Sequence, residues 1–356
     1  MSKSSHRGSA ATIVALVALA VFLVAAVPAF AATTVTGAGA TFPLPLYQQW
    51  AIDYNHKVPS VQVSYSGGGS GFGISEIKAG HVNFGGTDAP LSRADLDRFG
   101  LVQFPTCVGG VVPIVNVPGI KSGRLKLTGG VLADIYLGKI TKWNSKAIKA
   151  LNPTLSLPSL AIAVVYRSDA SGTSWIFTNY LARVSTVWAG AVGIGKTVAW
   201  PRGVGANGNP GVANTVKGKS GAIGYVEFAY AKSNKIPYTQ MKNRSGRWVL
   251  PTLMSFGAAA AGAKWSWSNG FYQVLVNQPG AKAWPITGAT FVLIKRSQSS
   301  QSFGRTMLKF FNWAYTNTTA KNDASRLNYV AMPSSVVSKV QTMWKLVKAS
   351  GKPCWP

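Results

Sequence analysis

Short strand-like runs alternate with helix-like segments through most of the 356-residue chain. The strand-like runs are rich in Val, Ile and aromatic residues and are bounded by Gly, Pro or Ser, as strands usually are. Leu46, Trp50 and Tyr54 recur at four-residue spacing, which is typical of one helix face. This alternation predicts an α/β fold with largely parallel sheets flanked by helices. The predicted strands span residues 61–65, 110–117, 161–166, 222–226 and 290–295, and the predicted helices span 45–54, 92–98, 173–183, 303–315 and 334–348.

One long segment breaks the alternation. Residues 201–219 contain many Gly, Asn and Pro residues and show no hydrophobic period, so we predict a long surface loop there. A chain of this size divides more readily into two lobes than it folds around one core. We therefore expect two lobes of α/β structure.

The first 31 residues have the features of a secretory signal peptide. Lys3 and Arg7 form a short positive region, which an almost unbroken apolar run over residues 11–27 follows. The next residues, Pro-Ala-Phe-Ala, supply a small-x-small site, so we predict cleavage near Ala31 and export as a soluble periplasmic or extracellular protein. A membrane anchor is the alternative, because the run approaches the ~18 residues that allow spanning. The adjacent cleavage site and the lack of a nearby Cys to carry a lipid favour the signal peptide.

The charge balance reveals a shortage of acids. The chain has 36 Lys and Arg but only 9 Asp and Glu, for a net charge of +27, yet charged residues make up only 13% of it. Because about 25% is typical, carboxylates are missing rather than basic residues in excess. The basic residues are scattered from Lys57 to Lys352 and form no tract with aromatic residues, which disfavours a nucleic acid or another polyanion as partner. We hypothesise that the protein works in an acidic medium, where surface carboxylates would add little charge.

The histidines and cysteines suggest no metal site. His56 and His81 lie in unrelated segments and no Cys-x-x-Cys occurs, so we expect neither a metal nor another cofactor. Cys107 and Cys354 are the two cysteines. In an exported protein they form either a disulfide or two separate buried thiols, and their spacing does not decide between these alternatives.

Three short turns rich in Gly, Ser and Thr stand between a predicted strand end and a helix. They span residues 36–42, 67–73 and 167–173. Free backbone N–H groups at a helix N-terminus, together with small hydroxyl side chains, form an anion site. No Gly-Lys-Ser/Thr follows the glycines, which excludes a Walker-type loop. One such turn is common in proteins, whereas three in one chain indicate convergence on a single anion across a cleft.

Two charged residues stand out near these turns. Arg167 offers a planar fork of donors to anionic oxygens, with a local ion pair to Asp169 as the alternative role. Asp88 lies in a Thr-Asp-Ala-Pro turn, where it either stabilises the turn or contacts the ligand. Because a carboxylate only accepts hydrogen bonds, Asp88 would favour an anion that still carries a proton.

Six motifs occur in order along the chain, at residues 36–43, 84–91, 134–140, 171–174, 221–227 and 284–287. In sequence and order they resemble those of the periplasmic phosphate-binding proteins of phosphate ABC importers. The resemblance implies a two-lobed periplasmic-binding-protein fold of the Venus-flytrap type. It implies a discontinuous first lobe, 32–106 plus 285–356, and a second lobe over 107–284. It also implies a monomer that captures phosphate with high affinity and delivers it to a membrane permease without catalysis.

The same resemblance assigns phosphate contacts to individual residues. Asp88 matches the aspartate that accepts the phosphate proton, and Asp169 matches the aspartate that holds the site arginine. Ser70 departs from the family pattern, which more often has paired serines at this place. The implied phosphate ligands are Thr41, Phe42, Ser70, Asp88, Arg167, Ser171, Gly172 and Thr173.

A secreted phosphatase and a general oxyanion-binding protein are the alternative functions. A phosphatase needs a nucleophile with a base, or metal ligands. Ser171 beside Thr173 offers a nucleophile, but His56 and His81 lie in unrelated segments. Asp88 disfavours oxyanions without a proton, such as molybdate.

Overall fold

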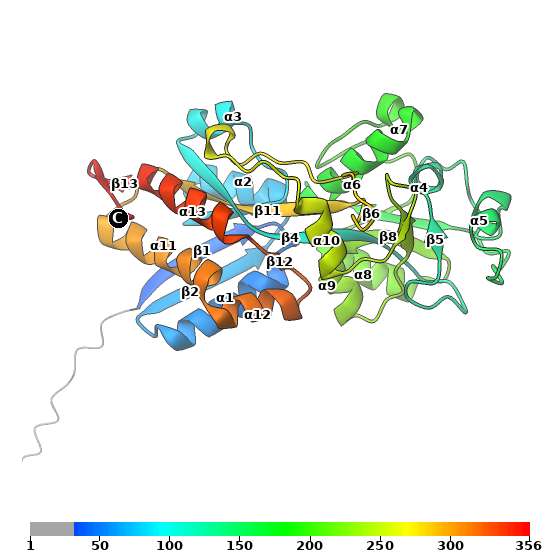
Figure 1. Cartoon of the computed structure of the whole chain (residues 1–356), viewed down its shortest axis with the longest axis horizontal. Helices are drawn as coiled ribbons and strands as arrows, with labels where there is room; N and C mark the ends of the chain where they lie inside the picture. Colours follow the sequence, from blue (N-terminus) through cyan, green and yellow to red (C-terminus); the bar gives the residue numbers. More distant parts are fainter. Residues whose placement is uncertain (1–31) are drawn as a thin grey trace, which may run out of the picture. The chain divides into compact units, whose positions relative to one another are not determined.

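A nine-stranded mixed sheet is the centre of the computed structural model, which describes residues 32–356 (Figure 1). The signal peptide predicted for residues 1–31 lies outside the described residues. The strands of this sheet are β1 (Thr33–Gly39), β2 (Val61–Gly67), β3 (Phe84–Thr87), β4 (Leu101–Val115), β6 (Ala163–Arg167), β7 (Val204–Ala206), β8 (Ala222–Glu227), β11 (Thr287–Lys295) and β12 (Val330–Ala331). Their order is β2–β1–β3–β11–β4–β8–β6–β7, and β12 pairs with β4 beside this path.

Strand pairing is parallel at both ends of the sheet and antiparallel in its middle. β2–β1–β3 and β8–β6–β7 pair in parallel, whereas β11 and β4 pair antiparallel with each other and with their other neighbours. The first part of β4 pairs with β11, and its last part, Val111–Val115, pairs with β8. The two-lobed α/β fold is confirmed. The sheet is mixed rather than largely parallel because β4 and β11 run antiparallel to each other and to the strands beside them, β8 and β3.

The helices group around the two halves of the sheet (Figure 1). The lobe boundaries at 106/107 and 284/285 stay a prediction, since β4 extends across the first and β11 begins at Thr287, just after the second. One half carries α1 (Leu44–Lys57), α2 (Ser70–Ala79), α3 (Arg93–Arg98), α11 (Gln301–Thr316), α12 (Thr318–Arg326) and α13 (Ser334–Met343). The other half carries α4 (Gly129–Tyr136), α5 (Lys146–Leu151), α6 (Gly172–Val184), α7 (Thr186–Ala191), α8 (Gly208–Gly218) and α9 (Phe228–Ser233), and α10 (Leu253–Ala260) lies near the middle.

Short elements complete the described chain. β5 (Lys126–Leu127), β9 (Gln240–Lys242) and β10 (Trp248–Val249) form a small second sheet, and β13 (Lys348–Ala349) pairs with β14 (Lys352–Pro353). Two 3₁₀ turns span Trp267–Asn269 and Trp344–Leu346. Each predicted strand and helix overlaps an observed one, but β4 begins at Leu101, before the predicted residue 110, and α13 ends at Met343 rather than at 348.

The surface loop predicted over residues 201–219 is wrong, because β7 and α8 occupy this segment. α8 buries Val212, Ala213 and Val216 on one face against β8. This burial outweighs the low helix propensity of the Gly, Asn and Pro residues that suggested a loop. Pro210 is tolerated because it lies in the first turn, where its missing N–H would have no helical partner.

Both cysteines are buried in the described structure and neither is bridged. Cys107 lies in β4, and Cys354 follows β14. Of the two alternatives, the structure therefore has two separate thiols. Within residues 32–356, no helix is long and apolar enough to cross a membrane.

Candidate functional site

The three predicted turns meet at the N-termini of three helices. Thr41 and Phe42 lie just before α1, Ser70 begins α2, and Ser171 caps α6 by accepting a hydrogen bond from the Ser174 N–H at 3.0 Å. The second and third turns touch directly, since the Gly71 N–H donates to the Ala170 carbonyl at 2.8 Å.

Gly172, in the third turn, packs directly against Ser70 and Asp88 from the other half of the sheet. A Cβ atom added to Gly172 would lie 2.3 Å from Ser70 Oγ and 2.7 Å from Asp88 Oδ2. Such distances are far below van der Waals contact, so only glycine permits this approach. The turn at 167–173 therefore faces Ser70 and Asp88 across the junction of the two halves.

Five buried backbone amides of these turns have no hydrogen-bond acceptor among residues 32–356. Unpaired buried N–H groups are rare in proteins, and the first-turn amides of a helix lack an intrahelical partner. At helix N-termini, such donors favour an anion. They belong to Thr41, Phe42, Ser70, Gly172 and Thr173.

Arg167 is held by a carboxylate and a hydroxyl. Its Nε donates to Asp169 Oδ1 at 2.7 Å, its Nη2 to Asp169 Oδ2 at 2.5 Å, and its Nη1 to Thr173 Oγ1 at 3.2 Å. Burial opposes ionisation of Asp169, but the Arg167 fork and the Gly208 N–H keep the pKa of this carboxyl below its ordinary value. The ion pair with Asp169 therefore exists, and it fixes the plane of the guanidinium.

Asp88 is a buried acid with an unusual protonation equilibrium. Its Oδ1 accepts from Thr290 Oγ1 at 2.8 Å, and its backbone N–H donates to Ser70 Oγ at 3.0 Å. Burial raises the pKa of Asp88 to about 7, against the Thr290 hydrogen bond and the positive charge of Arg167. Near neutral pH, this carboxyl is therefore poised between the acceptor and the donor form.

Sequence reasoning missed Thr290, which lies 202 residues from Asp88. β11 pairs with β3 and β4, and the pairing register with β4 shifts between Thr290 and Phe291. Such bulges redirect side chains. No local pattern marks Thr290 as a partner of Asp88, because the contact exists only through the sheet.

Sequence reasoning also missed Asn209 in α8, which is fully buried. Its backbone N–H and its Nδ2 donate to Thr41 Oγ1 at 3.1 and 2.9 Å, and its Nδ2 also donates to Thr173 Oγ1 at 3.2 Å. Asn209 thus links a threonine of the first turn with one of the third. Because its segment was predicted to be a surface loop, the sequence did not indicate that Asn209 lies in a helix beside the site.

Two tyrosines hold the carbonyls of the first turn. Tyr230 donates to the Thr41 carbonyl at 2.6 Å, and Tyr329 to the Phe42 carbonyl at 2.7 Å. The Tyr329 hydroxyl also lies 2.9 Å from Glu227 Oε2. The single phenol proton is thus shared between the Phe42 carbonyl and the Glu227 carboxyl group. Burial raises the pKa of Glu227 well above its ordinary value, against the hydrogen bonds from the Ala229 N–H and Tyr329.

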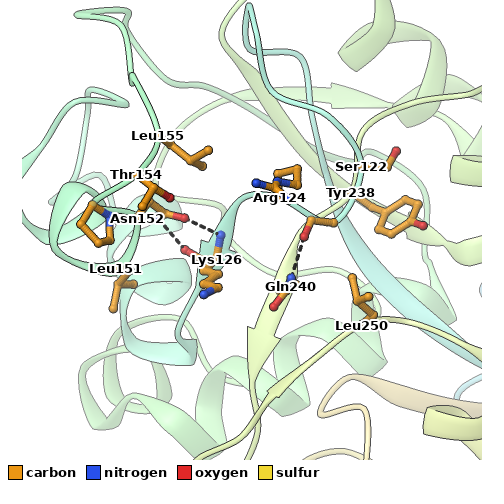
Figure 2. A pocket seen from close by; sticks show the side chains of 12 residues that line it. Ser122, Arg124, Lys126, Leu151, Asn152, Thr154, Leu155, Tyr238, Gln240 and Leu250 are labelled. Atoms are coloured by element: carbon orange, nitrogen blue, oxygen red, sulfur yellow. Dashed lines mark hydrogen bonds between the residues drawn. The ribbon is translucent and has the colours of Figure 1, made fainter.

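A separate cavity of about 490 Å³ lies near the small second sheet (Figure 2). Its amide side chains are already satisfied, since Asn152 bonds the backbone of Lys126 and Gln240 Nε2 donates to the Gly123 carbonyl. It contains none of the predicted ligand residues. Within residues 32–356, no group of three His, Cys, Asp or Glu side chains is suitably placed to hold a metal.

Comparisons with known proteins agree on one family. The family model for the PBP superfamily domain matches residues 24–318. The phosphate-binding protein PstS of Xylella fastidiosa (strain 9a5c) is 46% identical over 310 residues, which cover 87% of this chain and 84% of that protein. PstS of Pasteurella multocida is 45% identical over 326 residues, covering 91% and 94%.

Solved structures share the fold at low sequence identity. A high affinity periplasmic phosphate-binding protein solved with phosphate matches with a TM-score of 0.71 and 20% identity, covering 90% of this chain and 96% of that one. A phosphate binding protein from Stenotrophomonas maltophilia matches with a TM-score of 0.66 and 21% identity, covering 87% and 94%.

Proposed function

The chain belongs to the PstS family of phosphate-binding proteins within the PBP superfamily, and we propose from this premise that it captures inorganic phosphate at the three turns. One observation carries the proposal: five buried backbone amides that have no acceptor within residues 32–356 lie at helix N-termini beside a buried arginine. Fixed neutral donors replace the water that phosphate loses on entering such a site. The proposed ligands are Thr41, Phe42, Ser70, Asp88, Arg167, Ser171, Gly172 and Thr173, with Asp169 holding Arg167.

Asp88 accounts for selectivity in this proposal. Phosphate retains a proton near neutral pH and donates it to the Asp88 carboxylate, whereas sulfate has no proton to donate. A buried pair of acceptors without a proton costs several kcal/mol, which corresponds to a discrimination of roughly 10³ or more.

The proposal extends to cellular context and to lobe closure. The protein is exported after cleavage near Ala31, works as a monomer outside the cytoplasm, and hands phosphate to the permease of an ABC importer. The lobes 32–106 plus 285–356 and 107–284 close on the anion, as two-domain binding proteins do. Binding involves no covalent step: within residues 32–356, no hydrogen bond joins Ser171 or Thr173 to a histidine. This disfavours the phosphatase alternative.

Titration calorimetry of the phosphate-free protein with phosphate, arsenate and sulfate tests the function. We expect tight binding of phosphate and arsenate and weak binding of sulfate. Asp88→Asn should reduce the phosphate-to-sulfate ratio by about 10² or more, because an amide also donates to sulfate. Asp134→Asn, which changes a half-exposed carboxyl outside the site, is the matched control. No phosphate binding by the unmodified protein would refute the function, and an unchanged ratio in Asp88→Asn would refute only the role of Asp88.

A further inference from the structure

The hydroxyl groups of Thr41 and Thr173 both have their lone pairs occupied by N–H donors. Thr41 Oγ1 accepts from the Asn209 backbone N–H and from Asn209 Nδ2. Thr173 Oγ1 accepts from Arg167 Nη1 and from the same Asn209 Nδ2. A hydroxyl has two lone pairs and one proton, so these four contacts leave each threonine only its proton for a further bond.

Neither hydroxyl proton has an acceptor among residues 32–356. Both threonines are buried, Thr41 at 4% exposure and Thr173 at 0%. A buried donor without an acceptor is costly, so this pair is arranged for an external acceptor.

The orientation of the Asn209 amide is fixed by a third contact. Its Oδ1 accepts from the Glu227 backbone N–H at 2.9 Å. A backbone N–H only donates, so it must face the amide oxygen, and the NH₂ group must face the two threonines. A flipped amide would set its NH₂ against the Glu227 N–H and leave both threonine contacts to its oxygen.

We propose that Asn209 is a positioning residue that holds the hydroxyls of Thr41 and Thr173 as hydrogen-bond donors toward the bound anion. This inference deepens the proposed function and rests on it. The site then has opposite poles: Asp88 accepts, whereas Thr41 and Thr173 can only donate. A ligand must present a proton at the first pole and bare oxygens at the second.

Two substitutions separate the polarity of Asn209 from its volume. Asn209→Ala removes the Nδ2 donor, but each hydroxyl keeps one N–H partner, the backbone N–H of residue 209 for Thr41 and Arg167 Nη1 for Thr173. Each hydroxyl proton is then held less firmly toward the anion, so we expect phosphate affinity to fall on the order of 10-fold. Asn209→Asp keeps the shape and the acceptor for Glu227 but places a second oxygen against the threonines. Their protons then turn toward residue 209 and away from phosphate, and we expect a loss on the order of 100-fold.

A double-mutant cycle distinguishes this role from a packing role. In a Thr41→Val/Thr173→Val background there are no hydroxyls to orient, so Asn209→Ala should cause no further loss of phosphate affinity. In that background, Asn209→Asp should lower phosphate affinity less than it does in the parent protein. The loss of affinity that remains measures the effect of the added negative charge. Asn152→Ala is the matched control, because Asn152 is also buried and bonded to backbone but lies at the other cavity (Figure 2).

Calorimetry with inorganic phosphate, together with urea unfolding of each unliganded variant, decides the question. The proposal is supported if the loss from Asn209→Ala disappears in the valine background while Asn152→Ala leaves affinity unchanged. Equal losses in both backgrounds, or no loss in either, would overturn it. If Asn209→Ala does not fold, Asn209→Asp is compared in the two backgrounds instead. A smaller loss of phosphate affinity in the valine background supports the proposal, and an equal loss in both backgrounds overturns it. Absence of phosphate binding by the unmodified protein would instead refute the proposed function itself.

Discussion

Asp88→Asn should remove a pH dependence from the stability of the unliganded protein. The Asp88 side chain is 1% exposed, and burial raises its pKa from 3.8 to about 7, although the Thr290 hydrogen bond opposes this shift. The folded state thus binds the proton more tightly than the unfolded state. The stabilisation from this proton is complete below about pH 4 and disappears as pH rises through about 7.

The magnitude follows from the width of this pH window. Each pH unit within it changes the free energy of unfolding by about 1.4 kcal/mol. Over roughly three units, the buried carboxylate costs on the order of 4 kcal/mol at pH 8. Asn keeps a similar shape without this charge, so Asp88→Asn should match the parent protein at pH 4 and exceed it by that order of magnitude at pH 8.

Urea unfolding in phosphate-free buffer, followed by tryptophan fluorescence from pH 4 to pH 8, measures this difference. Subtracting the two curves cancels the titration of all other groups if they act independently. Asp134→Asn, which makes the same Asp-to-Asn change at a half-exposed carboxyl outside the site, is the control for the substitution itself. A difference between Asp88→Asn and the parent that stays constant with pH would refute the reasoning, because Asp88 would then ionise alike in the folded and unfolded states.

Two further substitutions test the contacts around the site. Gly172→Ala should lower phosphate affinity on the order of 100-fold by calorimetry, since its Cβ would lie 2.3 Å from Ser70 Oγ. Gly130→Ala is the control and should leave affinity unchanged, because nothing lies within 4 Å of its Cβ. Equal effects of the two substitutions would contradict the steric argument. Tyr329→Phe removes the hydrogen bond to the Phe42 carbonyl and should lower the free energy of unfolding, measured in urea, by about 1–3 kcal/mol. An unchanged midpoint and slope of the urea unfolding curve would show that this bond contributes no net stability.

The turns of the candidate site could be predicted because their signals are local. A strand end, a cluster of small residues and a helix start lie within a few positions of each other, as around Ser70 and Ser171. Parallel strands bring such turns to one edge of a sheet. The chemistry of Arg167 and Asp169 is local as well, because two positions separate them. For these residues, the structure adds distances to a pattern already visible in the chain.

The remaining site residues could not be predicted because long-range packing positions them. Asn209 lies in a segment whose Gly, Asn and Pro content favours a loop, and the segment becomes helical only by burying Val212 and Val216. Thr290 reaches Asp88 only because β11 is inserted between β3 and β4. A single sequence carries no signal for either contact.

The few acidic residues of the chain explain how charge is balanced at the candidate site. Among residues 32–356, Arg167 is the only buried Lys or Arg, and the Asp169 carboxylate compensates its charge. Asp88 and Glu227 have raised pKa values and therefore add little negative charge at acidic pH. Within residues 32–356, the surplus of basic residues is accordingly a property of the surface, and the proposed anion site relies on amide and hydroxyl dipoles. The acidic medium stays a hypothesis: the Asp88 proton stabilises the unliganded protein at low pH, whereas the proposed selectivity against sulfate requires the Asp88 carboxylate.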